Sequence, residues 1–174
     1  MTRIVSIFGL IAGTIAGLGI IATIVTSAQH SLFLGYLVML VALSAILVGV
    51  KQYRDQVRGG VIGFGLALLV GLGIAVVAGI AFTAVWEIYL ALNHYDIMNG
   101  YFDSMLAQKR AAHVSAADYQ KAVAEVQAMK AQYANPLYRL PETFIEIFPV
   151  GVLIALVSAA LLRNPRFLPA KAAA

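Results

Sequence analysis

Residues 66–92 read LALLVGLGIAVVAGIAFTAVWEIYLAL and are almost entirely apolar. Its single charged side chain is Glu87. The run is longer than the roughly 20 apolar residues that a helix needs to cross about 30 Å of hydrocarbon. Lipid offers the backbone no hydrogen-bond partners, so a helix is the expected structure. The stretch therefore predicts a membrane-spanning helix.

Three further stretches have the same character, namely residues 4–25, 32–50 and 141–162. Of the 174 residues, 61% are apolar types and 11% are charged, against roughly a quarter charged in soluble domains. A chain this short cannot bury so much apolar surface in one aqueous core. We therefore predict an all-α integral membrane protein, a single membrane domain over residues 1–174. It has four transmembrane helices and, between the third and the fourth, an extramembrane helical hairpin at about residues 93–140.

The distribution of cations predicts the orientation in the membrane. Arg3, the turn at residues 51–60 and the C-terminal segment 163–171 carry seven cations against the single acid Asp55, whereas the first connection, residues 26–31, has no Lys or Arg. Because positively charged loops stay in the cytoplasm, we expect both termini there and the hairpin exported. This asymmetry accounts for most of the formal charge of +4, so the lipid bilayer is the expected partner and no nucleic acid is. Selection of anionic lipid headgroups by these cations is an alternative role.

The first helix carries Gly9, Gly13 and Gly17 at four-residue spacing. Small residues four apart let another helix backbone approach closely. Packing inside the bundle and homodimerisation both remain open for this face.

Within the predicted hairpin, residues 97–106 repeat apolar side chains at helical spacing and are expected to continue the third helix out of the membrane. Ser115 followed by Asp118 predicts a helix start, a variant of the capping box. The dipeptide Asn135-Pro136 predicts that this helix ends there. The two helices should therefore pack their apolar faces together.

Three blocks of sequence carry a family resemblance. They are residues 51–65 (KQYRDQVRGGVIGFG), Trp86–Tyr89 (WEIY) and residues 135–151, which contain NPLYR and TFIEIFPVG. In this order they resemble bacterial proteins of domain-of-unknown-function family 4199 over nearly the whole chain. The resemblance implies a bacterial inner-membrane protein with four helices, and it implies no activity and no cofactor.

Three glutamates, Glu87, Glu142 and Glu146, lie where lipid or bundle interior is expected. An ionisable group within a membrane span is costly, so it usually faces the interior and marks function. At 1.5 Å per residue, Glu87 lies about 9 Å inward from Asn93 and Glu146 about 8 Å inward from Pro141. The two acids should therefore lie at the same depth in the outer leaflet.

Neighbouring residues extend this predicted site. Thr83 and His94 share a helix face with Glu87, and Arg139 lies one turn before Glu142. If the faces meet, they form a pocket for a cation, a proton or a lipid headgroup, built from Glu87, Glu146, Glu142, His94, Arg139 and Thr83. A structural Glu87–Arg139 ion pair, and a helix-start role for Glu142 after a proline, are the competing interpretations.

The leading functional hypothesis is a non-enzymatic inner-membrane protein that binds its ligand in this pocket. A second hypothesis is a structural or accessory partner of a larger membrane enzyme or transporter, which would dock through the glycine face or the hairpin. A third is a metal-assisted membrane hydrolase that uses His94 with the glutamates. The sequence contains no His-Glu-x-x-His, serine elbow or nucleotide loop to support an enzyme.

Overall fold

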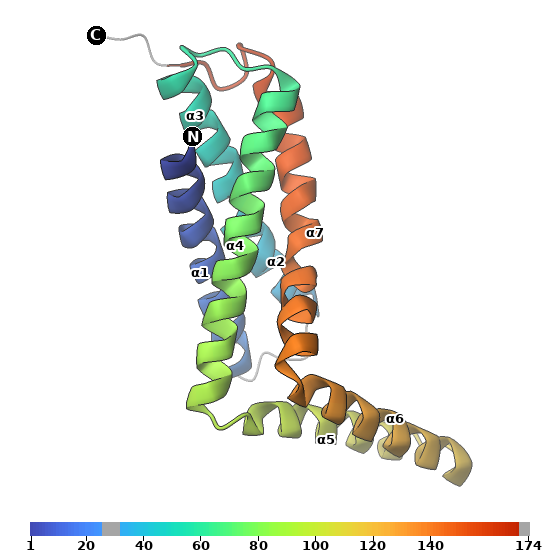
Figure 1. The fold of residues 1–174 in the computed structure, drawn as a ribbon. Coiled ribbons are helices and arrows are strands. Elements are labelled where there is room, and N and C mark those ends of the chain that lie inside the picture. The colour runs from blue at the N-terminus through green and yellow to red at the C-terminus, as the bar shows by residue number, and fades with distance from the viewer. Residues whose placement is uncertain (26–31, 171–174) are drawn as a thin grey trace. The chain divides into compact units, whose positions relative to one another are not determined.

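The computed structural model describes residues 1–25 and 32–170, and the regular structure in these residues is helical throughout. The predicted connection 26–31 and the cation Lys171 lie outside the described residues. The chain forms two compact units, which we call the span unit (Met1–Trp86 with Phe144–Ala174) and the α5–α6 unit (Glu87–Thr143). The helices, drawn in Figure 1, are α1 (Thr2–Val25), α2 (Leu32–Leu43), α3 (Ala45–Val57), α4 (Phe64–Leu92), α5 (Asp96–Ala111), α6 (Ala116–Ala134) and α7 (Pro136–Leu162).

Within the described residues, four helical stretches are long and apolar enough to cross a membrane: Thr2–Val25, Phe33–Val57, Phe64–Leu92 and Pro136–Leu162. The predicted all-α class with four candidate spans is therefore confirmed. The fourth span begins at Pro136 rather than at residue 141, because Pro136 occupies the first helical position, where its missing N–H leaves no bond unmade.

The second span consists of α2 and α3, which meet at Ser44. The Ser44 hydroxyl donates to the Val41 carbonyl at 2.6 Å, a local bond of the kind that bends helices. α3 then continues to Val57, so the prediction that this helix ends at residue 50 is wrong. Lys51 and Asp55 form an ion pair one turn apart, which stabilises the added helical turns.

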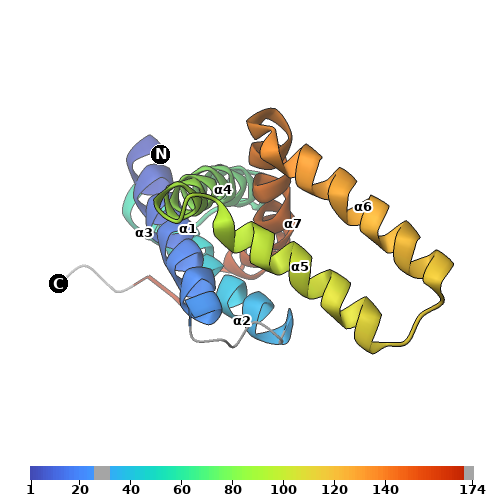
Figure 2. The same ribbon diagram turned by 90° about the horizontal axis from the view of Figure 1, so that it is seen from below.

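α4 is the central helix of the span unit and lies between α1 and α7 (Figure 2). On the α1 side, a Cβ added to Gly13 would lie 2.7 Å from the Ala81 Cβ, and one added to Gly17 would lie 2.7 Å from a Val85 methyl. On the α7 side, Gly71 faces Ala155. The glycine face that the sequence singles out, Gly9 included, is thus covered by α4 of the same chain.

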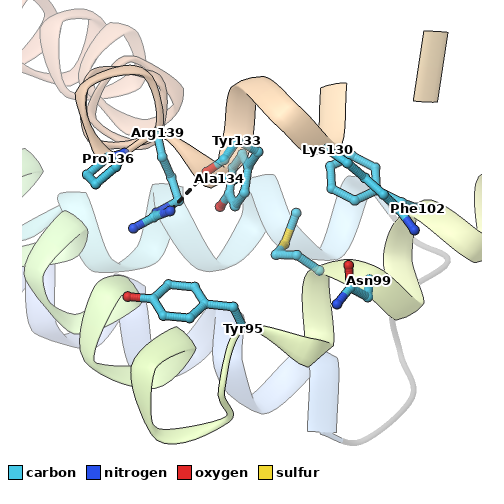
Figure 3. A pocket seen from close by; sticks show the side chains of 9 residues that line it. Tyr95, Asn99, Phe102, Lys130, Tyr133, Ala134, Pro136 and Arg139 are labelled. Carbon is cyan, nitrogen blue, oxygen red and sulfur yellow. Dashed lines mark hydrogen bonds between the residues drawn. The ribbon is translucent and has the colours of Figure 1, made fainter. Parts of the chain in front are cut away.

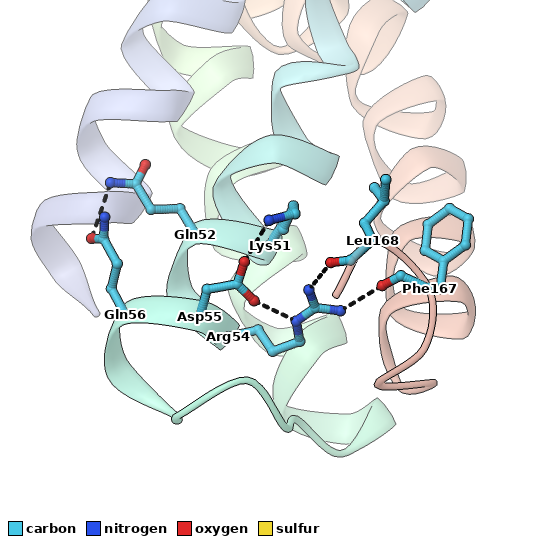
Figure 4. Close-up of polar contacts among 7 residues, drawn as sticks. All are labelled: Lys51, Gln52, Arg54, Asp55, Gln56, Phe167 and Leu168. Carbon is cyan, nitrogen blue, oxygen red and sulfur yellow. Dashed lines mark hydrogen bonds and ion pairs between the residues drawn. The ribbon is translucent and has the colours of Figure 1, made fainter. Parts of the chain in front are cut away.

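Arg54 lies at one end of the span unit, and its side chain is fully buried. Its polar contacts are drawn in Figure 4. Its Nε donates to Asp55 at 2.7 Å, and its two terminal nitrogens donate to the carbonyls of Phe167 and Leu168. The Arg54 carbonyl in turn accepts from the Gly60 N–H at 3.0 Å. One residue therefore ties together the end of α3, the turn before α4 and the segment after α7.

Helix α5 begins after a break in the helical structure rather than as a continuation of α4, which corrects the prediction. His94 and Tyr95 adopt φ angles of 51° and 62°, and this left-handed turn ends α4 at Leu92. α5 then packs along α6, with the rings of Phe102 and Tyr133 edge to face at 6.3 Å. Ser115 accepts from the Asp118 N–H at 3.1 Å, so the predicted helix start is confirmed.

Candidate functional site

Arg139 is the most constrained of the predicted site residues, and it is 5% exposed. Its Nε donates to one Glu87 carboxylate oxygen at 2.6 Å and a terminal nitrogen donates to the other at 2.9 Å. The remaining terminal nitrogen donates to the Tyr133 carbonyl at 2.9 Å. This bidentate arrangement is the strong form of an arginine–carboxylate pair. The structural ion pair considered for these two residues is therefore present.

Two tyrosine rings flank the same guanidinium. Its central carbon lies 4.9 Å from the centre of the Tyr95 ring and 5.7 Å from that of Tyr133. Such cation–π contacts are attractive because the ring face is electronegative. The left-handed turn before α5 brings Tyr95 to this position, and the last turn of α6 brings Tyr133.

A cavity of about 450 Å³ lies within the α5–α6 unit, and Arg139 is one of its lining residues (Figure 3). Two cations line this cavity, Arg139 and Lys130. The Lys130 ammonium is 6.0 Å from the centre of the Phe102 ring and 2.9 Å from an Asp103 carboxylate oxygen. The polar and aromatic lining residues are Tyr95, Asn99, Phe102, Lys130, Tyr133 and Arg139.

Sequence reasoning placed Arg139 in a site but missed the rest of this cavity. Tyr95, Asn99 and Phe102 recur at helical spacing, as do Lys130 and Tyr133, which is the one pattern that could have shown two lining faces. That pattern is also expected of ordinary packing between two helices, so it did not stand out.

The other predicted site residues are divided between the two units. His94 and Glu142 belong to the α5–α6 unit and are exposed. Thr83 and the exposed Glu146 belong to the span unit, where the Thr83 hydroxyl donates to the Gly79 carbonyl at 2.9 Å. Glu87 and Glu146 belong to different units. A meeting of their carboxylates in one pocket therefore stays a prediction.

Among residues 1–25 and 32–170, no group of three or more His, Asp or Glu side chains is placed to hold a metal ion. No curated protein and no solved structure matches the chain. The chain does belong, as the three sequence blocks indicated, to the family described as "Protein of unknown function (DUF4199)", whose sequence model matches residues 7–164.

Proposed function

We propose that this is a four-span, non-enzymatic protein of a bacterial inner membrane, with both termini cytoplasmic, that binds the headgroup of a membrane amphiphile in the cavity of the α5–α6 unit. The main observation in support of this proposal is the cavity and its lining residues. Its wall includes Arg139, four residues into the Pro136–Leu162 candidate span, so the site belongs to the end of a span. Headgroups lie at that level of a bilayer.

The orientation rests on where the cations gather. Arg54 and Arg58 stand at the α3–α4 turn, Arg163 and Arg166 stand after α7, and the Arg54 contacts bring these two segments to the same end of the span unit. Arg3 lines a hollow with Gln52 at this end as well. With the positive end cytoplasmic, the opposite ends of α4 and α7 are exported, and so are α5 and α6, which connect them in the chain.

A lipid headgroup is better supported than the other ligands considered from the sequence. Both carboxylate oxygens of Glu87 accept from Arg139, so a proton or metal cation would have to displace a buried guanidinium. Breaking a buried pair in this way leaves an uncompensated charge, which is strongly unfavourable. An accessory role through the glycine face is less favoured as well, because α4 covers that face.

Filling the cavity tests the proposal. Ala134 lines the cavity, whereas Ala131 is exposed on the same helix and does not. The protein, purified in mild detergent, is mixed with phospholipids, and bound lipid is counted by native mass spectrometry. We expect Ala134→Trp to lose a lipid adduct that the wild type and the matched control Ala131→Trp retain. A wild type without any adduct, or adducts equal in all three proteins, would contradict the proposal.

A further inference from the structure

We propose that the cavity selects an anionic headgroup, with an oxyanion such as a lipid phosphate held between Arg139 and Lys130. This inference rests on the amphiphile-binding function proposed above and names the class of ligand. The first support is the sign of the charge on the wall. Among the described residues that line the cavity, two are cations and none is acidic, because Glu87 and Asp103 bind the cations from outside the lining.

The second support is the number of donors that Arg139 has left. A guanidinium carries five N–H donors in a fixed fork. Three of its nitrogens are each used once, two toward Glu87 and one toward the Tyr133 carbonyl. Each terminal nitrogen therefore keeps one N–H without a partner among the described residues. These two donors stand on a side chain that lines the cavity, which suits a two-oxygen contact with phosphate.

The third support is the difference between the two ion pairs. The Arg139 side chain is 6% exposed and that of Glu87 is 21% exposed, so water screens their pair little. The Lys130 side chain is 33% exposed and that of Asp103 is 68% exposed, so water screens their pair and its net stabilisation is small. Lys130 can therefore exchange Asp103 for a ligand anion at little cost, while Arg139 stays in place.

The apolar part of the lining fits the rest of such a ligand. Phe102, 6% exposed, and Tyr95 present ring surface beside the cations, and Met98 adds a flexible apolar side chain. A volume of about 450 Å³ is within the range of small-molecule sites and accommodates a headgroup rather than a whole phospholipid. The acyl chains would then remain in the bilayer.

The test compares lipids and charge variants in the intact chain. Phosphatidylglycerol, which is anionic, and phosphatidylcholine, which is zwitterionic, are titrated by native mass spectrometry, with inorganic phosphate as a competitor. We expect phosphatidylglycerol to bind more tightly. Lys130→Gln should weaken its binding about fivefold, as expected for a partly exposed charge contact, and Asp103→Asn should strengthen it by freeing Lys130. Lys121→Gln, an exposed lysine on α6 outside the lining, is the matched control and should bind as the wild type does.

The outcomes separate the inference from the function on which it rests. If inorganic phosphate displaces phosphatidylglycerol at a concentration below that of the lipid, the anion selectivity holds and the ligand is a soluble phosphate compound. If it does not, the lipid is the source of the anion. Equal binding of the two lipids, or an Asp103→Asn variant that weakens binding as Lys130→Gln does, overturns the anionic inference and leaves amphiphile binding in place. Failure of both lipids to bind overturns both.

Discussion

Replacing Gly13 with alanine measures how tightly α1 packs against α4. The new Cβ would lie 2.7 Å from the Ala81 Cβ and 2.9 Å from the Phe82 backbone nitrogen, and closest of all to the Ala78 carbonyl oxygen. Ordinary contact begins near 3.4 Å, so the Ala81 contact alone requires the two helices to separate by roughly 0.7 Å, and the closer Ala78 oxygen requires more. Two of the three neighbouring atoms belong to the backbone of α4, so no side-chain rotation can relieve the contact.

The expected cost follows from two opposing effects. Overpacking of a close contact costs about 1–3 kcal/mol, while alanine gains up to about 1 kcal/mol over glycine in helix propensity. We expect a net loss of about 1–2 kcal/mol in the free energy of unfolding. Gly65→Ala is the matched control in α4, because no heavy atom lies within 4 Å of its added Cβ. That variant should stay within about 0.5 kcal/mol of the wild type.

Unfolding by sodium dodecyl sulfate in mixed micelles provides the measurement, and Trp86, the only tryptophan, supplies the fluorescence. The oligomeric state of each variant is checked by size-exclusion chromatography. The reasoning fails if Gly13→Ala unfolds at the same detergent fraction as the wild type and Gly65→Ala. A wild-type dimer that Gly13→Ala converts to a monomer of unchanged stability would instead place the glycine face between two copies of the chain.

Three further predictions concern topology, the closed end of the span unit and the start of α6. Because the chain has no cysteine, Lys121→Cys and Arg166→Cys report orientation directly. An impermeant thiol reagent should label only the first in intact spheroplasts, and the reverse pattern would invert the topology. Arg54→Met removes the donors to the Phe167 and Leu168 carbonyls and should destabilise the protein by about 1–3 kcal/mol. Arg58→Met, at an exposed position, is the control and should not; equal melting temperatures of the two variants in detergent would contradict this. Ser115→Ala removes the cap of α6 and should cost about 1 kcal/mol, seen as an earlier loss of helical circular dichroism on heating, while a curve that matches Ser104→Ala would show that the cap contributes nothing.

The spans could be predicted because a long apolar run has one physical solution in lipid, and α1 and α4 follow the predicted ranges within a few residues. The break between α4 and α5 could not be predicted from the sequence. Hydrophobic periodicity records which face of a helix is apolar and carries no information on φ, and neither His94 nor Tyr95 is a residue that usually marks a left-handed turn as glycine does. The apolar spacing beyond residue 96 therefore looked like one continuous helix.

Arg54 shows a second limit of the sequence. The rule that cations flank membrane spans explains why Arg54 lies in a cationic turn. From that rule alone, we would expect its side chain to be exposed to water. The structure instead buries it against two carbonyls more than a hundred residues away along the chain. Such a contact depends on how the segment after α7 returns to α3, which no local pattern encodes.

The structure pairs Glu87 with Arg139, whereas the sequence suggested an acid that binds a ligand. An acid in a span was taken to mark a ligand site because an unpaired carboxylate in lipid is costly. Here Arg139 removes that cost by binding both carboxylate oxygens. What the pair leaves available is not the acid but the arginine. Glu87 and the Tyr133 carbonyl fix its position, and its two remaining donors are on a side chain that lines the cavity. In the anion site that we propose, a half-buried carboxylate within a span supports the arginine and does not contact the ligand, and the ligand then has the opposite charge from the one the acid alone suggests.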